Sequence, residues 1–333
     1  MAQNCKYYKE KKQVSYDNGV TYVDVSPAEY RKGDLIESSS TDCGYSPTPT
    51  GYSNQYLTFV AVDSGTFSFS GTSYSTINNS SILYSTDNGS TWNTLNRNVQ
   101  SPTISAGNKI MWKSSALRPV AGGTSGGIGK FSSTGRFNIE GNIMSLLYGD
   151  NFANQTSLSN YAEAFDHLFE LNKVVSAENL ILPATTLSEA CYQSMFQSCS
   201  GLTTPPQLPA TALENYCYAG MFAYCPSLTT APILTATTLK QGCYSGMFTG
   251  CGLTTAPDLP ATEVKSECYL SMFSGCTSLN YVKCLATSLT GTVPTYNWLA
   301  NVASSGTFVK NSSMSSWTSG ASGIPSNWTV QNA

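Results

Sequence analysis

The sequence contains little charge. Asp, Glu, Lys and Arg make up 11% of the 333 residues, and the formal net charge is −3. Globular proteins typically contain about a quarter charged residues, so neutral polar side chains must cover most of this surface. The only basic cluster is short and comprises Lys9, Lys11 and Lys12. Nucleic-acid binding depends on a basic surface, so we expect no nucleic-acid partner.

Histidine and long apolar runs are also scarce. His167 is the only histidine, which leaves few candidates for general-base or zinc chemistry. We therefore expect no metal, no cofactor and no enzymatic activity. No apolar run approaches the roughly 18 residues of a membrane-spanning helix. The first residues, MAQNCKYYKEKKQ, carry charge where a secretory signal has its apolar segment. We expect synthesis in the cytoplasm without a signal peptide and no membrane insertion.

Cysteine, in contrast, is abundant and ordered. The chain has 11 cysteines, an odd number, so at least one has no intramolecular disulfide partner. Nine of them lie in a repeat built on CYxxMFxxC, whose copies begin at Cys191, Cys217, Cys243 and Cys268, at spacings of 26, 26 and 25 residues. A fixed period of this length indicates a repeat architecture.

We interpret each CYxxMFxxC copy as a short amphipathic helix, because Cys191, Met195 and Cys199 recur every four residues. A disulfide within one copy would then span roughly 12 Å, beyond the Cα limit of about 7 Å. Buried free cysteine behaves as a small hydrophobic residue. We predict that the core of the repeats is formed by Cys191, Met195, Phe196, Cys199, Cys217, Met221, Phe222, Cys225, Cys243, Met247, Phe248, Cys251, Cys268, Met272, Phe273 and Cys276. A disulfide between copies is the alternative.

Units of this length cannot bury their own apolar face and must stack. We predict a C-terminal α/β leucine-rich-repeat solenoid over residues 141–333, each copy containing a strand, a turn, an extended piece and a helix. A degenerate first copy at 164–187 would cap one end. Trp298, Phe308 and Trp328 would close the other.

A short turn motif occurs twice in the first half. Asp-Asn-Gly favours a tight turn between two strands, and it lies in SYDNGVTY, with Asp17 and Gly19, and in STDNGSTW, with Asp87, Gly89 and Trp92. Both copies resemble the Asp-box hairpin of sialidases and other β proteins. The resemblance to sialidases would also imply an active site with three arginines, a tyrosine and a glutamate. We find no such group of residues, and only Arg97, Arg118 and Arg136 lie in the neighbouring segment. A glycosidase is therefore a remote alternative.

The remaining pattern completes a three-part organisation. Residues 51–140 contain short alternating segments such as YLTFVAVDSGTFSFSG, separated by Gly, Asn and Ser turns, which predict a β-sandwich. Residues 1–50 form the predicted N-terminal attachment module with its β-hairpin. The expected fold class is mainly β with short helices.

The repeat consensus CYxxMFxxCxxLTTxPxLPATxL resembles the BspA-like leucine-rich repeats. Together with VSYDNGVTYVDVSPAEYRKGDLIESSSTDCG and FNIEGNIMSLLYGDNF, it makes nearly the whole chain similar to fibre-type structural proteins of crAss-like phages that infect Bacteroidales. The resemblance implies a non-enzymatic virion protein, a head or tail fibre subunit whose N-terminal segment contacts other virion proteins. It also implies a homo-oligomer, often a trimer, that adheres to a glycan or protein of the bacterial surface. A bacterial surface or secreted BspA-like adhesin is the alternative.

Aromatic side chains are the candidates for such adhesion. We predict a binding surface that includes Tyr224, Tyr296 and Asn297. The column Tyr192, Tyr218, Tyr244 and Tyr269 either packs between copies or faces a ligand. The sequence leaves open the receptor, the docking partner, head or tail location, and pairing of Cys5 with Cys43.

Overall fold

The structure is a computed structural model that describes residues 54–70, 82–96, 98–115 and 129–333, and the backbone of four N-terminal strands. The chain divides into two compact units, Met1–Pro47 and Thr48–Ala333. No helix in the described ranges has the length and apolar character needed to cross a membrane.

The N-terminal unit contains one antiparallel four-stranded sheet in the order β3-β2-β1-β4. Its strands are β1 (Asn4–Tyr8), β2 (Lys11–Ser15), β3 (Val23–Asp24) and β4 (Leu35–Ser39). The first predicted Asp-box turn, with Asp17 and Gly19, falls between β2 and β3 and lies outside the described residues, as does Cys43. Only the backbone of Cys5 is described.

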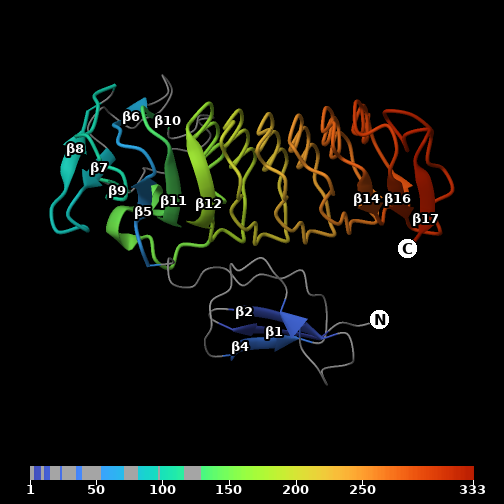
Figure 1. The fold of residues 1–333 in the computed structure, drawn as a ribbon, viewed down its shortest axis with the longest axis horizontal. Helices are drawn as coiled ribbons and strands as arrows, with labels where there is room; N and C mark the ends of the chain where they lie inside the picture. Colours follow the sequence, from blue (N-terminus) through green and yellow to red (C-terminus); the bar gives the residue numbers. More distant parts are fainter. Residues whose placement is uncertain are drawn as a thin grey trace. The chain divides into compact units, whose positions relative to one another are not determined.

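The second unit begins with a mixed six-stranded sheet in the order β12-β11-β5-β9-β7-β8 (Figure 1). Its strands are β5 (Leu57–Ala61), β7 (Ile82–Ser85), β8 (Asn93–Leu95), β9 (Lys109–Ser114), β11 (Phe137–Asn142) and β12 (Val174–Ile181). A separate pair contains β6 (Phe67–Ser70) and β10 (Lys130–Ser133). Helix α1 (Ser145–Tyr148) and the 3-10 helix η2 (Gly149–Asn151) follow β11. This arrangement replaces the predicted β-sandwich.

An aromatic cluster around Phe59 of β5 fills the core on one face of this sheet. The Phe59 ring lies 5.2 Å from Phe67, 4.8 Å from Phe137 and 5.8 Å from Phe169, measured between ring centroids. Phe169 belongs to the first repeat copy, and β11 pairs in parallel with β12. The boundary predicted after residue 140 falls inside β11, so the sheet and the repeats share one core.

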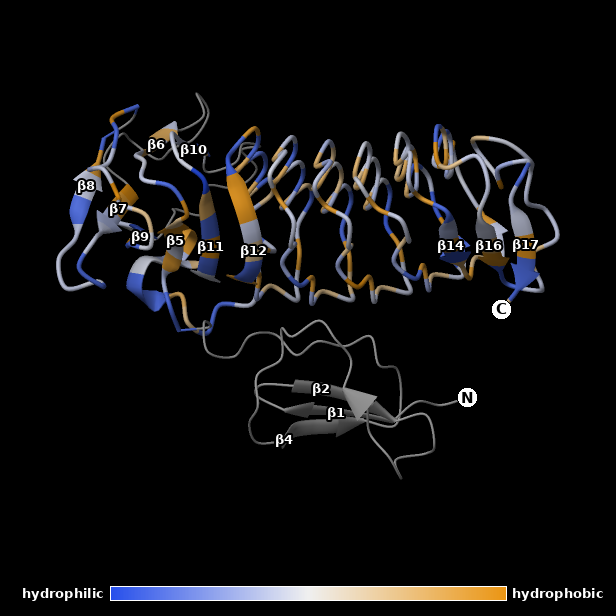
Figure 2. Ribbon diagram, in the orientation of Figure 1, coloured by the Kyte–Doolittle hydropathy of each residue, from blue (hydrophilic) through white to orange (hydrophobic). Residues whose placement is uncertain are grey.

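Residues 157–301, which we call the repeat stack, place successive copies side by side. Isolated parallel bridges join Thr186 to Ala212 and Ala212 to Thr238. Hydrophobic residues recur in every copy (Figure 2). The ring of Phe222 stacks between Phe196 and Phe248 at 5.7 Å from each, a spacing typical of favourable aromatic contact.

The CYxxMFxxC segments are not helices. Their backbone N–H groups alternate: Gln193 N donates to Ala190 O in its own copy, whereas Tyr192 N donates to Cys217 O of the next copy. An α-helix would direct every N–H to the fourth preceding carbonyl. Positive φ recurs every fourth residue, at Glu163, His167, Leu171, Ala190, Ser194, Ser198, Tyr216, Gly220, Tyr224, Gly242, Gly246, Gly250, Glu267, Ser271, Gly275, Val293, Asn297 and Asn301. Each segment is therefore a series of turns.

The strands also depart from the predicted solenoid. Within the described residues, no strand lies between β12 and β13 (Glu263–Val264). Strand β13 pairs only with β15 (Ser288–Leu289), and the last sheet has the order β14-β16-β17. These three strands are β14 (Tyr281–Cys284), β16 (Thr307–Lys310) and β17 (Thr329–Asn332). Because the sheets do not form a solenoid, the predicted α/β leucine-rich-repeat solenoid is wrong. The predicted mainly β character of the chain agrees with the structure.

Two glycines test the turn geometry. Gly242 and Gly246 have nearly equal positive φ, 58° and 60°, so Ala would impose similar backbone strain at both. A Cβ at Gly242 would lie 2.2 Å from Tyr216 Cε1, whereas the nearest atom at Gly246 is Thr249 Oγ1 at 3.5 Å. Relieving that clash moves the Tyr216 hydroxyl from Glu267 and Gln241, both 2.8 Å away.

We expect Gly242→Ala to lower the free energy of unfolding by about 1–2 kcal/mol more than Gly246→Ala, the cost of the displaced hydrogen bonds. Urea denaturation of both variants measures this difference. Equal losses would contradict the placement of Tyr216 across Gly242.

Candidate binding surfaces

The second Asp-box turn is a closed hydrogen-bond network between β7 and β8. The Asp87 carboxylate accepts bonds from Thr91 N at 2.9 Å, Thr91 Oγ1 at 2.6 Å and Ser85 Oγ at 2.7 Å. Gly89 has φ of 85° and donates its N–H to Ser85 Oγ, while Trp92 Nε1 donates to Gly89 O. The structure brings the predicted Asp87, Gly89 and Trp92 together, and their polar groups are used within the turn.

These bonds hold the Asp87 carboxylate in its charged form. The Thr91 hydroxyl and N–H, with Ser85, lower the pKa of Asp87 to about 2. A carboxyl whose pKa is depressed in the folded state stabilises the fold above its unfolded pKa of about 3.9. That contribution is lost as the pH falls through the folded value.

We therefore expect Asp87→Asn to lower the Tm at pH 6. The Tm difference from the wild type should shrink as the pH falls below about 4 and continue to shrink toward pH 2. Thermal unfolding of both proteins at a series of pH values checks this. A difference that stays constant from pH 6 to pH 2 would be inconsistent with a charged Asp87 in the turn.

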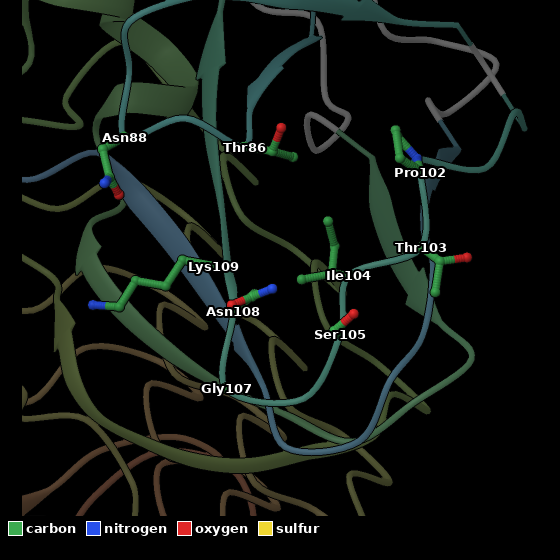
Figure 3. Close-up of a pocket in the computed structure, with 9 residues that line it drawn as sticks. All are labelled: Thr86, Asn88, Pro102, Thr103, Ile104, Ser105, Gly107, Asn108 and Lys109. Atoms are coloured by element: carbon green, nitrogen blue, oxygen red, sulfur yellow. The ribbon is translucent and has the colours of Figure 1, made fainter.

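A cavity of about 410 Å³ lies beside this turn (Figure 3). The turn contributes Thr86 and Asn88, and the segment before and at the start of β9 contributes Pro102, Thr103, Ile104, Ser105, Gly107, Asn108 and Lys109. Figure 3 shows these residues around one open space, with the Lys109 amine directed away from Ile104. Our sequence predictions did not include this cavity, because its two segments share no local pattern.

The predicted repeat-core residues are buried in the stack. Every cysteine, methionine and phenylalanine predicted for the repeat core is at most 3% exposed. The thiols of Cys199, Cys225, Cys251 and Cys276 each donate to a phenylalanine carbonyl of the preceding copy, at 2.9 to 3.1 Å. Burial raises the pKa of Cys191 and of Cys199 to about 12. All nine described cysteines are free thiols, and Cys243 Sγ lies 3.8 Å from Cys268 Sγ.

The tyrosine column packs between copies. Tyr192 stacks on Tyr218 at 5.7 Å, and Tyr218 stacks on Tyr244 at 6.1 Å. Burial raises the pKa of each of these tyrosines well above its usual range. These rings are therefore part of the core and are not available to a ligand.

The exposed tyrosines lie on the turn segments. Tyr224 and Tyr296 are 56% and 53% exposed, and Asn297 is half-buried. A Cβ at Gly250 would lie 3.0 Å from Tyr224 Cδ1, so the Tyr224 ring rests against the glycine of the next copy. Tyr224 and Tyr296 are three copies apart, which is about 14 Å along the stack at about 4.8 Å per copy. Both belong to the exposed side of the turn segments, which we call the turn face, and they do not form one cluster.

Tyr216 is a turn-face residue that our sequence predictions missed. Its hydroxyl donates to Glu267 Oε2, two copies away, and accepts from Gln241 Nε2. Gly242 was the sequence feature that could have indicated this contact, because only a residue without a Cβ leaves room for the Tyr216 ring there. Tyr216 is half-buried and fixes the copies on either side of it.

The other candidate catalytic groups contact a neighbouring carboxylate or lie outside the described ranges. His167 Nδ1 lies 2.6 Å from Asp166 Oδ1, which raises the pKa of His167. Arg136 binds Asp63 through two nitrogens, at 2.7 and 3.0 Å. Arg97 and Arg118 lie outside the described residues.

Comparisons with family models, with curated proteins and with solved structures found no match. The turn face and the cavity are therefore the two features of the described residues from which we infer a partner.

Proposed function

We propose that this chain is a non-enzymatic virion protein, a fibre-type subunit that attaches to a glycan or protein of the host surface through its turn face. The observation that carries the proposal is the exposure of Tyr224 and Tyr296 on the turn face, at 56% and 53%. Tyrosine is favoured at binding interfaces because its ring is apolar and its hydroxyl stays hydrated. The virion assignment rests on the resemblance of the repeats and of the first half to phage fibre-type proteins.

The turn face suits attachment for a second reason. Between Tyr216 and Tyr224 in the same copy, the side chains of Ala219 and Ala223 are buried and Gly220 has none, so they do not cover either ring. In the next copy, Ser245, Gly246 and Thr249 continue this low surface. Because the backbone below is tied to both neighbouring copies, the residues that carry the aromatic rings do not have to be ordered when a partner arrives, which lowers the entropic cost of binding.

The N-terminal unit is the proposed contact to other virion proteins. It folds as its own sheet and is separate from the unit that carries the turn face. We extend the proposal to a homo-oligomer, a trimer by analogy with fibre proteins.

Binding of the purified, fluorescently labelled protein to host cells tests the turn face. We expect Tyr224→Ala and Tyr296→Ala each to weaken binding at least about tenfold, the loss typical of an interface aromatic, and Tyr224→Trp to retain it. Val330→Ala is the matched control, because Val330 is exposed on β17, away from the turn segments. Binding unchanged in both tyrosine variants would exclude the turn face as the attachment surface.

A further inference from the structure

We propose that the cavity beside the Asp-box turn binds one unit of a neutral saccharide. This site is separate from the turn face and goes beyond the proposed function. The cavity, about 410 Å³, falls within the range of about 300–1,000 Å³ found for small-molecule sites.

The lining side chains offer hydrogen bonds that the protein does not use. Thr86, Asn88, Ser105 and Asn108 are exposed, and none of their side chains is bonded to another residue in the part of the chain that the structure describes. Hydroxyl and amide groups both donate and accept. This matches saccharide hydroxyls, each of which also donates and accepts. Pro102, which is exposed as well, supplies an apolar contact for the C–H groups of a sugar ring.

The charge of the site favours a neutral ligand. Lys109 is the only ionic side chain among the lining residues. Its amine pairs with Glu140 Oε1, to which Gln55 Nε2 also donates at 2.8 Å. A phosphate or carboxylate ligand would have to compete with Glu140 for this cation. A ligand without charge leaves the ion pair intact.

Both walls are fixed before a ligand arrives. Ile104 and Gly65 exchange two backbone hydrogen bonds, at 2.8 and 3.0 Å. Gly107 N donates to Ala61 O at 2.8 Å, which holds the segment against β5. The Asp87 network holds the opposite wall. Binding therefore orders few residues, so little of the interaction free energy is lost.

An array of neutral, sialylated and sulfated oligosaccharides, probed with the full-length protein, tests the proposal. The strongest ligand is then titrated by calorimetry against the wild type and three variants. Asn108→Ala removes one lining amide. Asn88→Gly removes another and suits the φ of 56° at this position. Asn93→Ala is the matched control, an exposed amide on β8 that does not line the cavity.

We expect neutral oligosaccharides to bind. Asn108→Ala and Asn88→Gly should each weaken affinity about tenfold, the loss of one well-placed hydrogen bond, and Asn93→Ala should leave it within about twofold. Equal Tm values for the variants and the wild type show that the fold is retained.

Three results would overturn the proposal: no saccharide binds, only charged saccharides bind, or affinity is unchanged in both cavity variants. Tyr224→Ala separates this proposal from the previous one. If saccharide affinity is lost in Tyr224→Ala but kept in Asn108→Ala and Asn88→Gly, the sugar sits on the turn face and the cavity proposal fails alone. If cell binding is unaffected by Tyr224→Ala and by Tyr296→Ala while Asn108→Ala abolishes saccharide binding, the turn-face proposal fails alone.

Discussion

The turn segment of each repeat copy depends on the next copy for about half of its backbone hydrogen bonds. In the turn segments every second N–H donates to a carbonyl of the next copy, and an N–H left unpaired in the interior costs about 1–3 kcal/mol. A single copy is therefore not a stable structure, and stability comes from contacts between nearest neighbours. The stacked phenylalanine and tyrosine rings and the thiol bonds to preceding copies add further contacts between neighbouring copies.

This constraint separates the residues that hold the fold from those free to serve a partner. The core needs Cys, Tyr, Met and Phe at fixed positions, and the left-handed positions need residues that tolerate positive φ. Tyr224 stands at one of these left-handed positions, with φ of 60°, where the next two copies have Gly250 and Gly275, so the backbone does not require this ring. A rigid stack with a variable face suits attachment. The cavity uses the same principle, because it too lies between segments fixed by backbone bonds.

The sequence predicted what depends on side-chain polarity and local pattern. Burial of Met195 and Phe196 follows from their apolar character, whatever the backbone does, and the Ser85 to Trp92 motif determines its own turn. The helix prediction failed because a four-residue turn repeat and an α-helix place Cys191, Met195 and Cys199 at the same spacing. Gly242, Gly246 and Gly250 are spaced four residues apart, and this spacing was the sign that every fourth residue has a positive φ. The sandwich prediction failed because the parallel pairing of β11 with β12 depends on contacts distant in sequence. The cavity was not predicted for the same reason, because its two walls come from segments distant in sequence.

The proposed attachment role requires the protein to be part of a particle. Quantitative mass spectrometry of density-purified virions, beside the surface and secreted fractions of the bacterial host, measures this directly. The account predicts a fixed copy number relative to the major capsid protein in virions. Absence from particles together with abundance on the bacterial surface would contradict it.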